Sequence, residues 1–294
     1  MVGTPMDRTA MPEFPVITHP DKRYWPEDGI TKARMIDYYR RMAPLMLPWF
    51  RDRPVTLRLF PKGIHGPAFY RRERPGNAPP SVRALPYRTA TDHHRIDLML
   101  IDSLEGLLYL ANLGAIEFHL WSSRAPRLDR PDWAIFDLDP GDKSEFTQVL
   151  EAALHLRDAL DDAGLPSFAK TSGASGLHLY CPNRKGLDFD TLRAWVRDLA
   201  ETLSHTHPSL IATAHGKTHS GKRITIDHAQ NGIGKNTAAP YTLRALPGAP
   251  VSTPVSWQEI ERGRIRPDDF TLDRLPDRVE AVGDLFSPLL NALN

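Results

Sequence analysis

The sequence contains very little cysteine: its 294 residues include one, Cys181. A single cysteine excludes a disulfide within the chain, so we expect a reducing cytoplasm. Residues 1–12 lack the apolar block of a signal peptide, and we expect them to form a flexible tail. The longest apolar stretch, 98–118, is interrupted by acidic and amide side chains, which predicts one or two core helices and no membrane span.

The chain also lacks a strong net charge, which is +1 at neutral pH. This value argues neither for nor against nucleic acid as a partner. The charge is unevenly distributed, since residues 51–95 hold ten Lys and Arg against three acids, with aromatic side chains such as Phe69 and Tyr70 among them. Basic groups can neutralise phosphates while aromatic faces stack on bases. A nucleic-acid surface and a solvated basic face are both compatible with this composition.

Apolar periodicity predicts an alternation of helices and strands. A helix is expected within 28–47 and a strand over 54–61, and the proline-rich segment 75–86 is typical of a loop. The second half should contain, in order, a strand over 133–139, a helix capped by Ser144 and ended by Gly164, a strand, glycine turn and strand over 167–181, a helix capped by Asp190, and a strand over 222–227. This order predicts an α/β (α+β) fold with helices packed on a sheet.

Two aspartates end the apolar stretch "WAIFDLDPGD" (133–142). On a strand, Asp137 and Asp139 point to the same face, while Leu138 points to the other. Two carboxylates this close repel each other unless a cation lies between them. Acids that begin a turn and face water are the commoner explanation of such a pair. The apolar strand before them and Pro140-Gly141 after them favour a metal site for Mg²⁺ or Mn²⁺.

A third acid, Asp227, ends the β-branched strand within "RITIDHAQN" (223–231). Three aspartates at strand ends are the kind of set that holds two metal ions about 3.5–4 Å apart for phosphoryl transfer. Several basic residues lie near Asp227 in the sequence, among them Lys217 and Arg244. Beside a metal-bound triphosphate they would bind phosphate, and without one they form a solvated basic stretch.

The segment "KTSGASGLHLY" (170–180) places Ser172, Ser175 and two glycines in a turn before a strand that carries His178. Backbone amides in such a turn can converge on an anion. An ordinary hairpin turn without a ligand is the more frequent explanation. The G-x-x-x-x-G-K-[ST] spacing of a Walker A loop is absent.

Taken together, these segments resemble the polymerase domain of bacterial ligase D, in the archaeo-eukaryotic primase superfamily. The resemblance runs in order through "ITHPDKRYWPEDGITKARMIDYY", "RPVTLRLFPKGIHGPAFY", "EFHLW", "FDLDPGD", "TSGASGLHLY", "IDHAQNGIGKNTAAPYTLR" and "PVSW". It implies a central mixed β-sheet that bears the metal site and is flanked by helices, with a basic N-terminal lobe. It also implies one catalytic domain over 13–294, divided into a DNA-binding lobe (13–90) and a catalytic sheet lobe (91–294).

The resemblance assigns roles to individual residues. The three catalytic, metal-binding carboxylates are Asp137, Asp139 and Asp227. The implied nucleotide-binding residues are Ser172, Ser175, His178, His119, Lys217 and Arg244. The implied ligands of the downstream 5′-phosphate are His19, Lys22 and Lys32, and Phe69 and Tyr70 are expected to pack against the template.

The implied activity is template-directed addition of nucleotides, preferably ribonucleotides, to 3′ ends at gaps or breaks during non-homologous end joining. Two ions, Mn²⁺ or Mg²⁺, would be the cofactors. The expected partners are gapped or broken DNA, NTP or dNTP, the Ku end-binding protein and a DNA ligase, with no membrane and a nucleoid-associated cytoplasmic location. Four positions depart from the family pattern: Ser175 and Ser220 replace basic residues, His19 replaces asparagine, and His228 follows the third aspartate.

Two other functions remain open from the sequence. A haloacid-dehalogenase-like phosphatase also ends a strand in D-x-D, and Asp137 would then be its nucleophile and Asp139 its acid/base. In that family the motif normally opens the domain, whereas here over 130 residues precede it. A DNA-end-binding module without catalysis is the other alternative, although all three predicted metal ligands are acidic.

Overall fold

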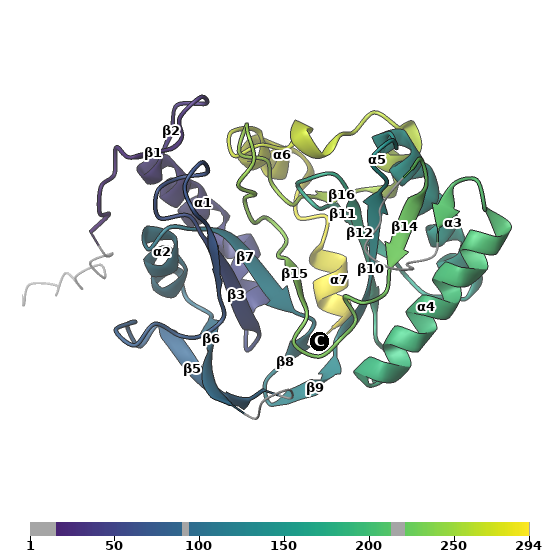
Figure 1. Cartoon of the computed structure of the whole chain (residues 1–294), viewed down its shortest axis with the longest axis horizontal. Helices are drawn as coiled ribbons and strands as arrows, with labels where there is room; N and C mark the ends of the chain where they lie inside the picture. The colour runs from purple at the N-terminus through teal and green to yellow at the C-terminus, as the bar shows by residue number, and fades with distance from the viewer. Residues whose placement is uncertain (1–15, 90–93, 213–220, 294) are drawn as a thin grey trace, which may run out of the picture.

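The computed structural model describes residues 16–89, 94–212 and 221–293, so the predicted tail 1–12 lies outside it. Two six-stranded sheets form the framework (Figure 1). The first has the order β15-β7-β3-β6-β5, with β4 paired to β3, and all its pairs are antiparallel. Its strands are β3 (Pro54–Leu59), β4 (Phe69–Arg71), β5 (Val82–Arg88), β6 (Arg95–Ile101), β7 (Ala115–Trp121) and β15 (Asn236–Ala238).

The second sheet has the order β13-β14-β10-β12-β11-β16 and is mixed, because β13 and β14 are parallel and the other pairs are antiparallel. Its strands are β10 (Trp133–Pro140), β11 (Phe168–Thr171), β12 (Leu177–Pro182), β13 (Ile211–Ala212), β14 (Ile224–Asp227) and β16 (Pro254–Val255). Two small hairpins complete the set: β1 (Arg23–Trp25) with β2 (Ile30–Thr31), and β8 (Ser123–Arg124) with β9 (Arg127–Pro131). The predicted α/β class and the mixed sheet are confirmed.

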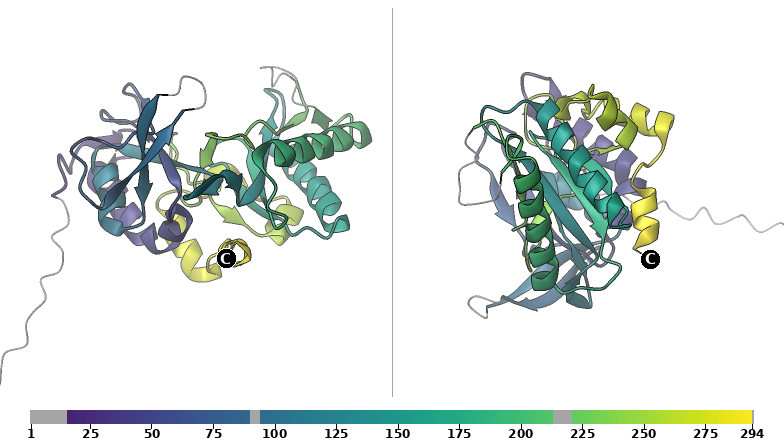
Figure 2. Two further views of the ribbon diagram at one scale, coloured as in Figure 1. Left: turned by 90° about the horizontal axis from the view of Figure 1, so that it is seen from below. Right: turned by 90° about the vertical axis from the view of Figure 1, so that its right-hand side faces the viewer.

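The helices flank the sheets. They are α1 (Lys32–Phe50), α2 (Leu104–Asn112), α3 (Phe146–Asp162), α4 (Phe189–Thr206), α5 (Trp257–Arg262), α6 (Arg274–Val282) and α7 (Ser287–Ala292), with a 3₁₀ turn at Pro267–Asp269. Helices α3 and α4 cover the outer face of the second sheet (Figures 1 and 2). No helix among the described residues is long and apolar enough to cross a bilayer.

Two predicted helix caps are wrong by one or two residues. Helix α3 is capped at Glu145 rather than Ser144, and the Glu145 amide donates to the Gln148 side chain (3.0 Å). Helix α4 is capped by Asp188 rather than Asp190, since the Asp188 carboxylate accepts from the Thr191 amide (2.9 Å). In each case an acidic residue close to the predicted one occupies the N-cap position instead.

The apolar stretch 98–118 forms strand, helix and strand rather than one or two helices, because Ser103 and Gly114 interrupt it. The segment 75–86 is not entirely a loop, since β5 begins at Val82. Strands β5, β6 and β7 all belong to the first sheet, and the chain reaches the second sheet through the β8–β9 hairpin. The division into lobes at residue 90 stays a prediction.

Strand β10 separates two hydrophobic cores by simple alternation. Ala134, Phe136 and Leu138 face α3 and α4, whereas Trp133 and Ile135 face a core shared with the first sheet and α1. Phe286, just before α7, packs in that shared core against the rings of Trp49 and Tyr180. The left view of Figure 2 shows the C-terminal helices lying between the two sheets. Asp137 and Asp139 continue the row of Trp133 and Ile135 and therefore lie on the side facing the first sheet.

Candidate active site

The three predicted catalytic aspartates lie on two neighbouring strands. Asp137 of β10 is opposite His178 of β12 on one side and opposite Asp227 of β14 on the other, while Asp139 is opposite Thr225. Since β10 is central in its sheet, three carboxylates and an imidazole are held within one small area of rigid backbone. The Asp137 side chain is buried in this row, with 8% of the residue exposed.

The electrostatics of this row favour a cation. Burial raises the pKa of the Asp137 carboxyl well above its ordinary value, and the neighbouring charges of Asp139 and Asp227 raise it further. Carboxylates that are forced together in this way are stabilised when a positive charge lies between them. Their hard oxygen donors suit Mg²⁺ or Mn²⁺.

The side chains are not arranged around one point. Among the described residues, no three His, Cys, Asp or Glu side chains are grouped so that they could hold a metal ion. One oxygen of Asp227 accepts from the Ala229 amide (2.7 Å), and Asp137 Oδ1 lies 3.3 Å from His178 Nε2. The three carboxylates are suitable ligands for a divalent cation, and the strands hold their backbones close together. The carboxylate side chains would have to rotate to enclose an ion.

A buried lysine, Lys170, holds the His178 ring in place. The sequence analysis did not identify this residue. The Nζ atom of Lys170 lies 3.0 Å from Nδ1 of His178 and donates to Oγ of Ser252 (2.5 Å). Burial lowers the pKa of Lys170 well below its ordinary value, and Arg244 lowers it further, against the opposing effect of Asp137. The signal in the sequence was a lysine inside the apolar strand "SFAKT", eight residues before His178.

The glycine turn between β11 and β12 packs directly on β10. A Cβ atom on Gly176 would lie 2.5 Å from the carbonyl oxygen of Leu138, so only glycine allows this approach. Ser172 Oγ accepts from the amides of Ala174 (3.1 Å) and Gly176 (3.0 Å) and thereby holds the turn. Ser172 is buried, whereas Ser175 is exposed at the tip of the turn.

Arg244 connects this turn to the first sheet. Its Nη1 donates to the Ser172 carbonyl (2.6 Å), and its Nε lies 3.3 Å from Oε2 of Glu117 on β7. Glu117 is almost fully buried and also pairs with Arg58 (3.2 Å) and His119 (3.0 Å). Burial alone would raise the pKa of Glu117, but the hydrogen bond from His119 and the charge of Arg244 lower it to about 2. Glu117 is therefore the ionised centre of a cationic cluster, and the sequence analysis did not identify it.

His119 lines a cavity of about 480 Å³ on the face of the first sheet, together with Thr56, Tyr70, Arg72, Gly234 and Asn236. Its ring packs edge-on against Tyr70 at a centroid distance of 6.0 Å. Phe69 and Tyr70 are 49% and 63% exposed on β4, so part of each ring is accessible to a ligand.

A buried asparagine holds the segment that follows Asp227. The Asn231 side chain accepts from the Ile135 amide (2.8 Å) and donates to the Ile135 carbonyl (2.7 Å), as a neighbouring strand would. The chain then forms β15, in which Ala238 is opposite His119. Asp227 and His119 are therefore connected by one short segment that spans both sheets.

The predicted 5′-phosphate residues lie together at the N-terminal end of α1. The Lys32 amide donates to the Lys22 carbonyl (2.8 Å), and the Lys22 amide donates to the His19 carbonyl (3.1 Å). Lys32 Nζ donates to the carbonyl and hydroxyl of Thr18, both at 2.8 Å, and burial with the nearby charge of Lys22 lowers its pKa to about 8. The structure thus brings these residues together at the start of α1. Lys217 and Ser220 lie outside the described residues.

Comparison with known proteins gives consistent matches. The family model described as LigD, primase-polymerase domain, matches residues 31–286. The multifunctional non-homologous end joining protein LigD of Mycolicibacterium smegmatis is 32% identical over 277 residues, which cover 93% of this chain and 36% of that protein. LigD of Pseudomonas aeruginosa is 32% identical over 269 residues, covering 91% of this chain and 32% of that protein. The chain therefore spans about a third of the length of these relatives.

A solved structure is also similar over the whole fold. The polymerase domain of Mycobacterium tuberculosis ligase D, in complex with DNA, matches with a TM-score of 0.87 and 30% sequence identity. The match covers 94% of this chain and 98% of that one.

Proposed function

Because the chain belongs to the family of LigD primase-polymerase domains, which are nucleotidyltransferases, we propose that it adds nucleotides to DNA 3′ ends under the direction of a template. The substrates are gapped or broken DNA ends in double-strand break repair, with NTP or dNTP as nucleotide donor. The observation that supports this most strongly is the position of Asp137 in the strand ladder, between His178 and Asp227. The phosphatase alternative finds no support in this family.

The family depends on metal ions, and we propose that Asp137, Asp139 and Asp227 hold two of them, Mn²⁺ or Mg²⁺. Bound there, such ions would neutralise the carboxylates and the charge on the transferred phosphoryl group. The raised pKa of Asp137 is consistent with this assignment, since burial and then the charges of Asp139 and Asp227 disfavour its ionised form unless a cation is present.

The remaining residues position the nucleotide. Arg244, fixed by Glu117 and the Ser172 carbonyl, supplies positive charge for the triphosphate. The Ser172 hydroxyl oxygen accepts hydrogen bonds from the turn amides. Its O–H group is therefore free to donate a hydrogen bond to a phosphate oxygen. His178, supported at Nδ1 by Lys170, presents Nε2 toward Asp137 and the same space. His119, Ser175 and Lys217 complete the proposed nucleotide site. Fixed donors of this kind act mainly by positioning and electrostatic stabilisation.

The DNA contacts are proposed at two places. Phe69 and Tyr70 are exposed beside His119 and would pack against the template. His19, Lys22 and Lys32 form a cationic pocket for the 5′-phosphate of the downstream strand. We also propose a preference for ribonucleotides, and Ku and a DNA ligase as partners, on the family resemblance and the end-joining role named for the relatives.

Primer extension across a short gap tests this function. The substrate carries either a 5′-phosphate or a 5′-hydroxyl on the downstream strand, and Mn²⁺ or Mg²⁺ is supplied with NTP or dNTP. We expect extension that is stimulated by the 5′-phosphate and abolished in Asp137→Ala, which retains DNA binding through Lys22 and Lys32. Intact DNA binding without extension under any metal would identify a non-catalytic end-binding module. Hydrolysis of an aryl phosphate would instead support the phosphatase alternative.

A further inference from the structure

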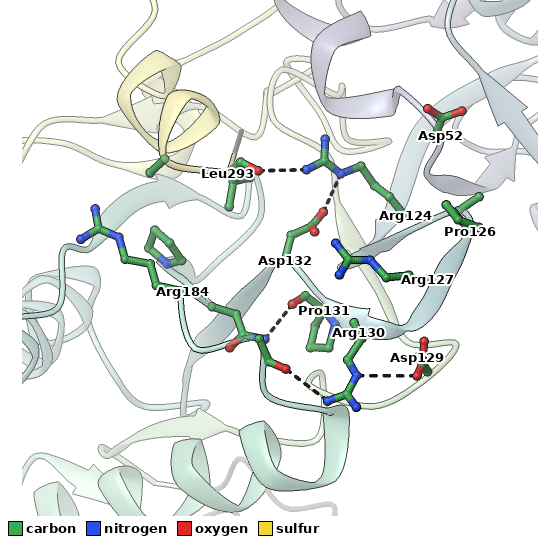
Figure 3. Close-up of a pocket in the computed structure, with 15 residues that line it drawn as sticks. Asp52, Arg124, Pro126, Arg127, Asp129, Arg130, Pro131, Asp132, Arg184 and Leu293 are labelled. Carbon is green, nitrogen blue, oxygen red and sulfur yellow. Dashed lines mark hydrogen bonds and ion pairs between the residues drawn. The ribbon is translucent and has the colours of Figure 1, made fainter.

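A cavity in the described part of the chain is separate from the proposed active site. It measures about 770 Å³ and lies between the β8–β9 hairpin, the loop that follows β12 and the end of α7 (Figure 3). Four arginines line it: Arg124, Arg127, Arg130 and Arg184. None of them belongs to the residues assigned above to nucleotide, template or 5′-phosphate.

Two of the three acids in the wall of this cavity are closely paired with arginines. Asp132 Oδ2 pairs with Arg53 (2.6 Å) and with Arg124 (2.8 Å). Asp52 pairs with Arg83 at 2.7 Å. Asp129 is the exception, because it is exposed and lies 3.7 Å from Arg130. An anion that enters the cavity therefore meets an excess of positive charge.

Two of the arginines are available for a ligand. Arg127 and Arg184 are exposed, and neither guanidinium has an ion pair or hydrogen bond to any residue that the structure describes. In Figure 3 the Arg127 guanidinium lies near the centre of the view and the Arg184 side chain extends to the left, with no dashed line to either guanidinium. A planar guanidinium binds phosphate through two parallel hydrogen bonds, so each of these arginines can bind a phosphate group.

The wall between them is fixed before any ligand arrives. Asn183 donates through Nδ2 to the Pro131 carbonyl (2.8 Å) and through its amide to the Asp132 carbonyl (2.8 Å). Arg130 Nη1 donates to the Gly186 carbonyl (3.1 Å). These bonds join the hairpin to the loop after β12, so the spacing of the two free arginines does not have to be created on binding.

The position of the cavity suggests what carries the phosphate. Asp132 of the cavity wall directly precedes β10, and Asp137 lies five residues after Asp132. Five residues of strand span ~17 Å, and phosphates of one DNA strand advance ~3.4 Å along the axis per nucleotide, so for DNA that runs along β10 the separation corresponds to roughly five nucleotides. Figure 1 shows β1 and β2, next to Lys22 and Lys32, at the top and β8 and β9 at the bottom.

We propose that this arginine-lined cavity binds backbone phosphates of the duplex upstream of the primer terminus, about five or more base pairs from the site of nucleotide addition. Downstream DNA would be held at the opposite end, by the 5′-phosphate pocket. This inference rests on the proposed polymerase function for the direction in which the DNA runs. The presence of an anion site rests on Arg127 and Arg184 alone.

Equilibrium binding without nucleotide or metal tests it independently of catalysis. Two fluorescent gapped substrates are compared, one with twelve and one with about four base pairs upstream of the gap, the shorter ending before the expected contact. The test variant is Arg127→Ala/Arg184→Ala, and the matched control is Arg262→Ala/Arg264→Ala, which removes two exposed arginines at the end of α5. Arg127→Lys/Arg184→Lys restores the charge, and thermal melting checks that each variant is folded.

For the longer substrate we expect roughly tenfold weaker binding by the test variant, and a slope of log K against log salt that is smaller by about two. The shorter substrate and the control variant should show neither change, and the lysine variant should recover most of the slope. Equal affinities of the test variant and wild type for the longer substrate would overturn the proposal, as would equal losses on both substrates.

Stabilisation of wild type by inorganic phosphate, lost in the test variant without any change in DNA binding, would indicate a free phosphate ligand instead. Competition by polyglutamate but not by DNA would indicate an acidic protein. Because the binding measurements contain no nucleotide or metal, their outcome does not depend on whether the protein extends primers.

Discussion

The Nζ atom of Lys170 lies 3.0 Å from Nδ1 of His178, and both side chains are buried between β11 and β12. A hydrogen bond from lysine to Nδ1 places the imidazole proton on Nε2, which faces Asp137 at 3.3 Å. A buried lysine without an adjacent carboxylate partner is costly for stability. This arrangement therefore indicates a positioning role for Lys170.

Lys170→Met keeps the length of the side chain and removes the amine. We expect the KM for the nucleotide to rise roughly tenfold, the effect of losing about 1.4 kcal/mol, with a smaller change in kcat. The free energy of unfolding should stay the same or rise, because a buried amine is replaced by an apolar group. Steady-state kinetics and thermal melting measure both effects, with the exposed Lys185→Met as control. A loss of stability with unchanged KM would mean that Lys170 is purely structural.

Asp137→Asn removes one charge from the three carboxylates. Because burial and then Asp139 and Asp227 raise the pKa of Asp137, its ionised form costs stability at pH values above the ordinary carboxyl range. We expect the variant to melt a few degrees higher than wild type at neutral pH in the absence of metal. Mn²⁺ should raise the melting temperature of wild type and leave the variant nearly unchanged. Equal responses to Mn²⁺ would contradict a metal site at these aspartates.

Lys22→Ala and Lys32→Ala should each reduce the stimulation of gap filling by a 5′-phosphate roughly tenfold. Extension on substrates with a 5′-hydroxyl should change much less. Lys62→Ala is the matched control, since Lys62 is an exposed lysine in the neighbouring segment. The measurement is the ratio of initial rates on the two substrates.

The same pocket predicts a dependence on pH. Burial and Lys22 lower the pKa of Lys32 to about 8, so its ammonium is charged below that pH and neutral above it. We expect the 5′-phosphate stimulation to be full at pH 7. It should fall between about pH 7.5 and 9, because the pH then passes the Lys32 pKa of about 8. When Lys32 loses its charge it no longer attracts the phosphate, so the stimulation decreases as the pH rises. A ratio that is constant over this range would show that Lys32 does not contact the phosphate.

Asn231→Asp keeps the shape of the side chain but loses the donor to the Ile135 carbonyl. The carboxylate would then face a buried carbonyl oxygen, so we expect a loss of about 2 kcal/mol in the free energy of unfolding. Extension should also weaken, because the segment that follows Asp227 is no longer fixed to β10. Chemical denaturation gives the first quantity. Asn236→Asp, a partly buried asparagine on β15, serves as the comparison.

The sequence predicted those parts of the site that depend on local patterns. Alternation along 133–139 placed Asp137 and Asp139 on one face, and the glycines of 172–176 predicted the turn that packs on β10. Both predictions depend only on the period of a strand and the freedom of glycine.

The contacts between distant segments could not be predicted in this way. Glu117 and Arg244 are separated by 127 positions, and nothing near either residue indicates the ion pair. The first sheet was not predicted as a separate sheet for the same reason, since β15 reaches β7 across more than a hundred residues. Lys170 and Asn231 appeared as ordinary polar residues, because their importance comes from burial, which a single sequence does not show.

The most direct test of the account is the addition of one nucleotide to a gapped substrate, measured for each of the four template bases. With Mn²⁺ present, we predict that the complementary nucleotide is added in every case and that Asp137→Asn adds none while binding the same DNA. Addition that ignores the template base, or that persists in Asp137→Asn, would contradict template-directed transfer at these three aspartates.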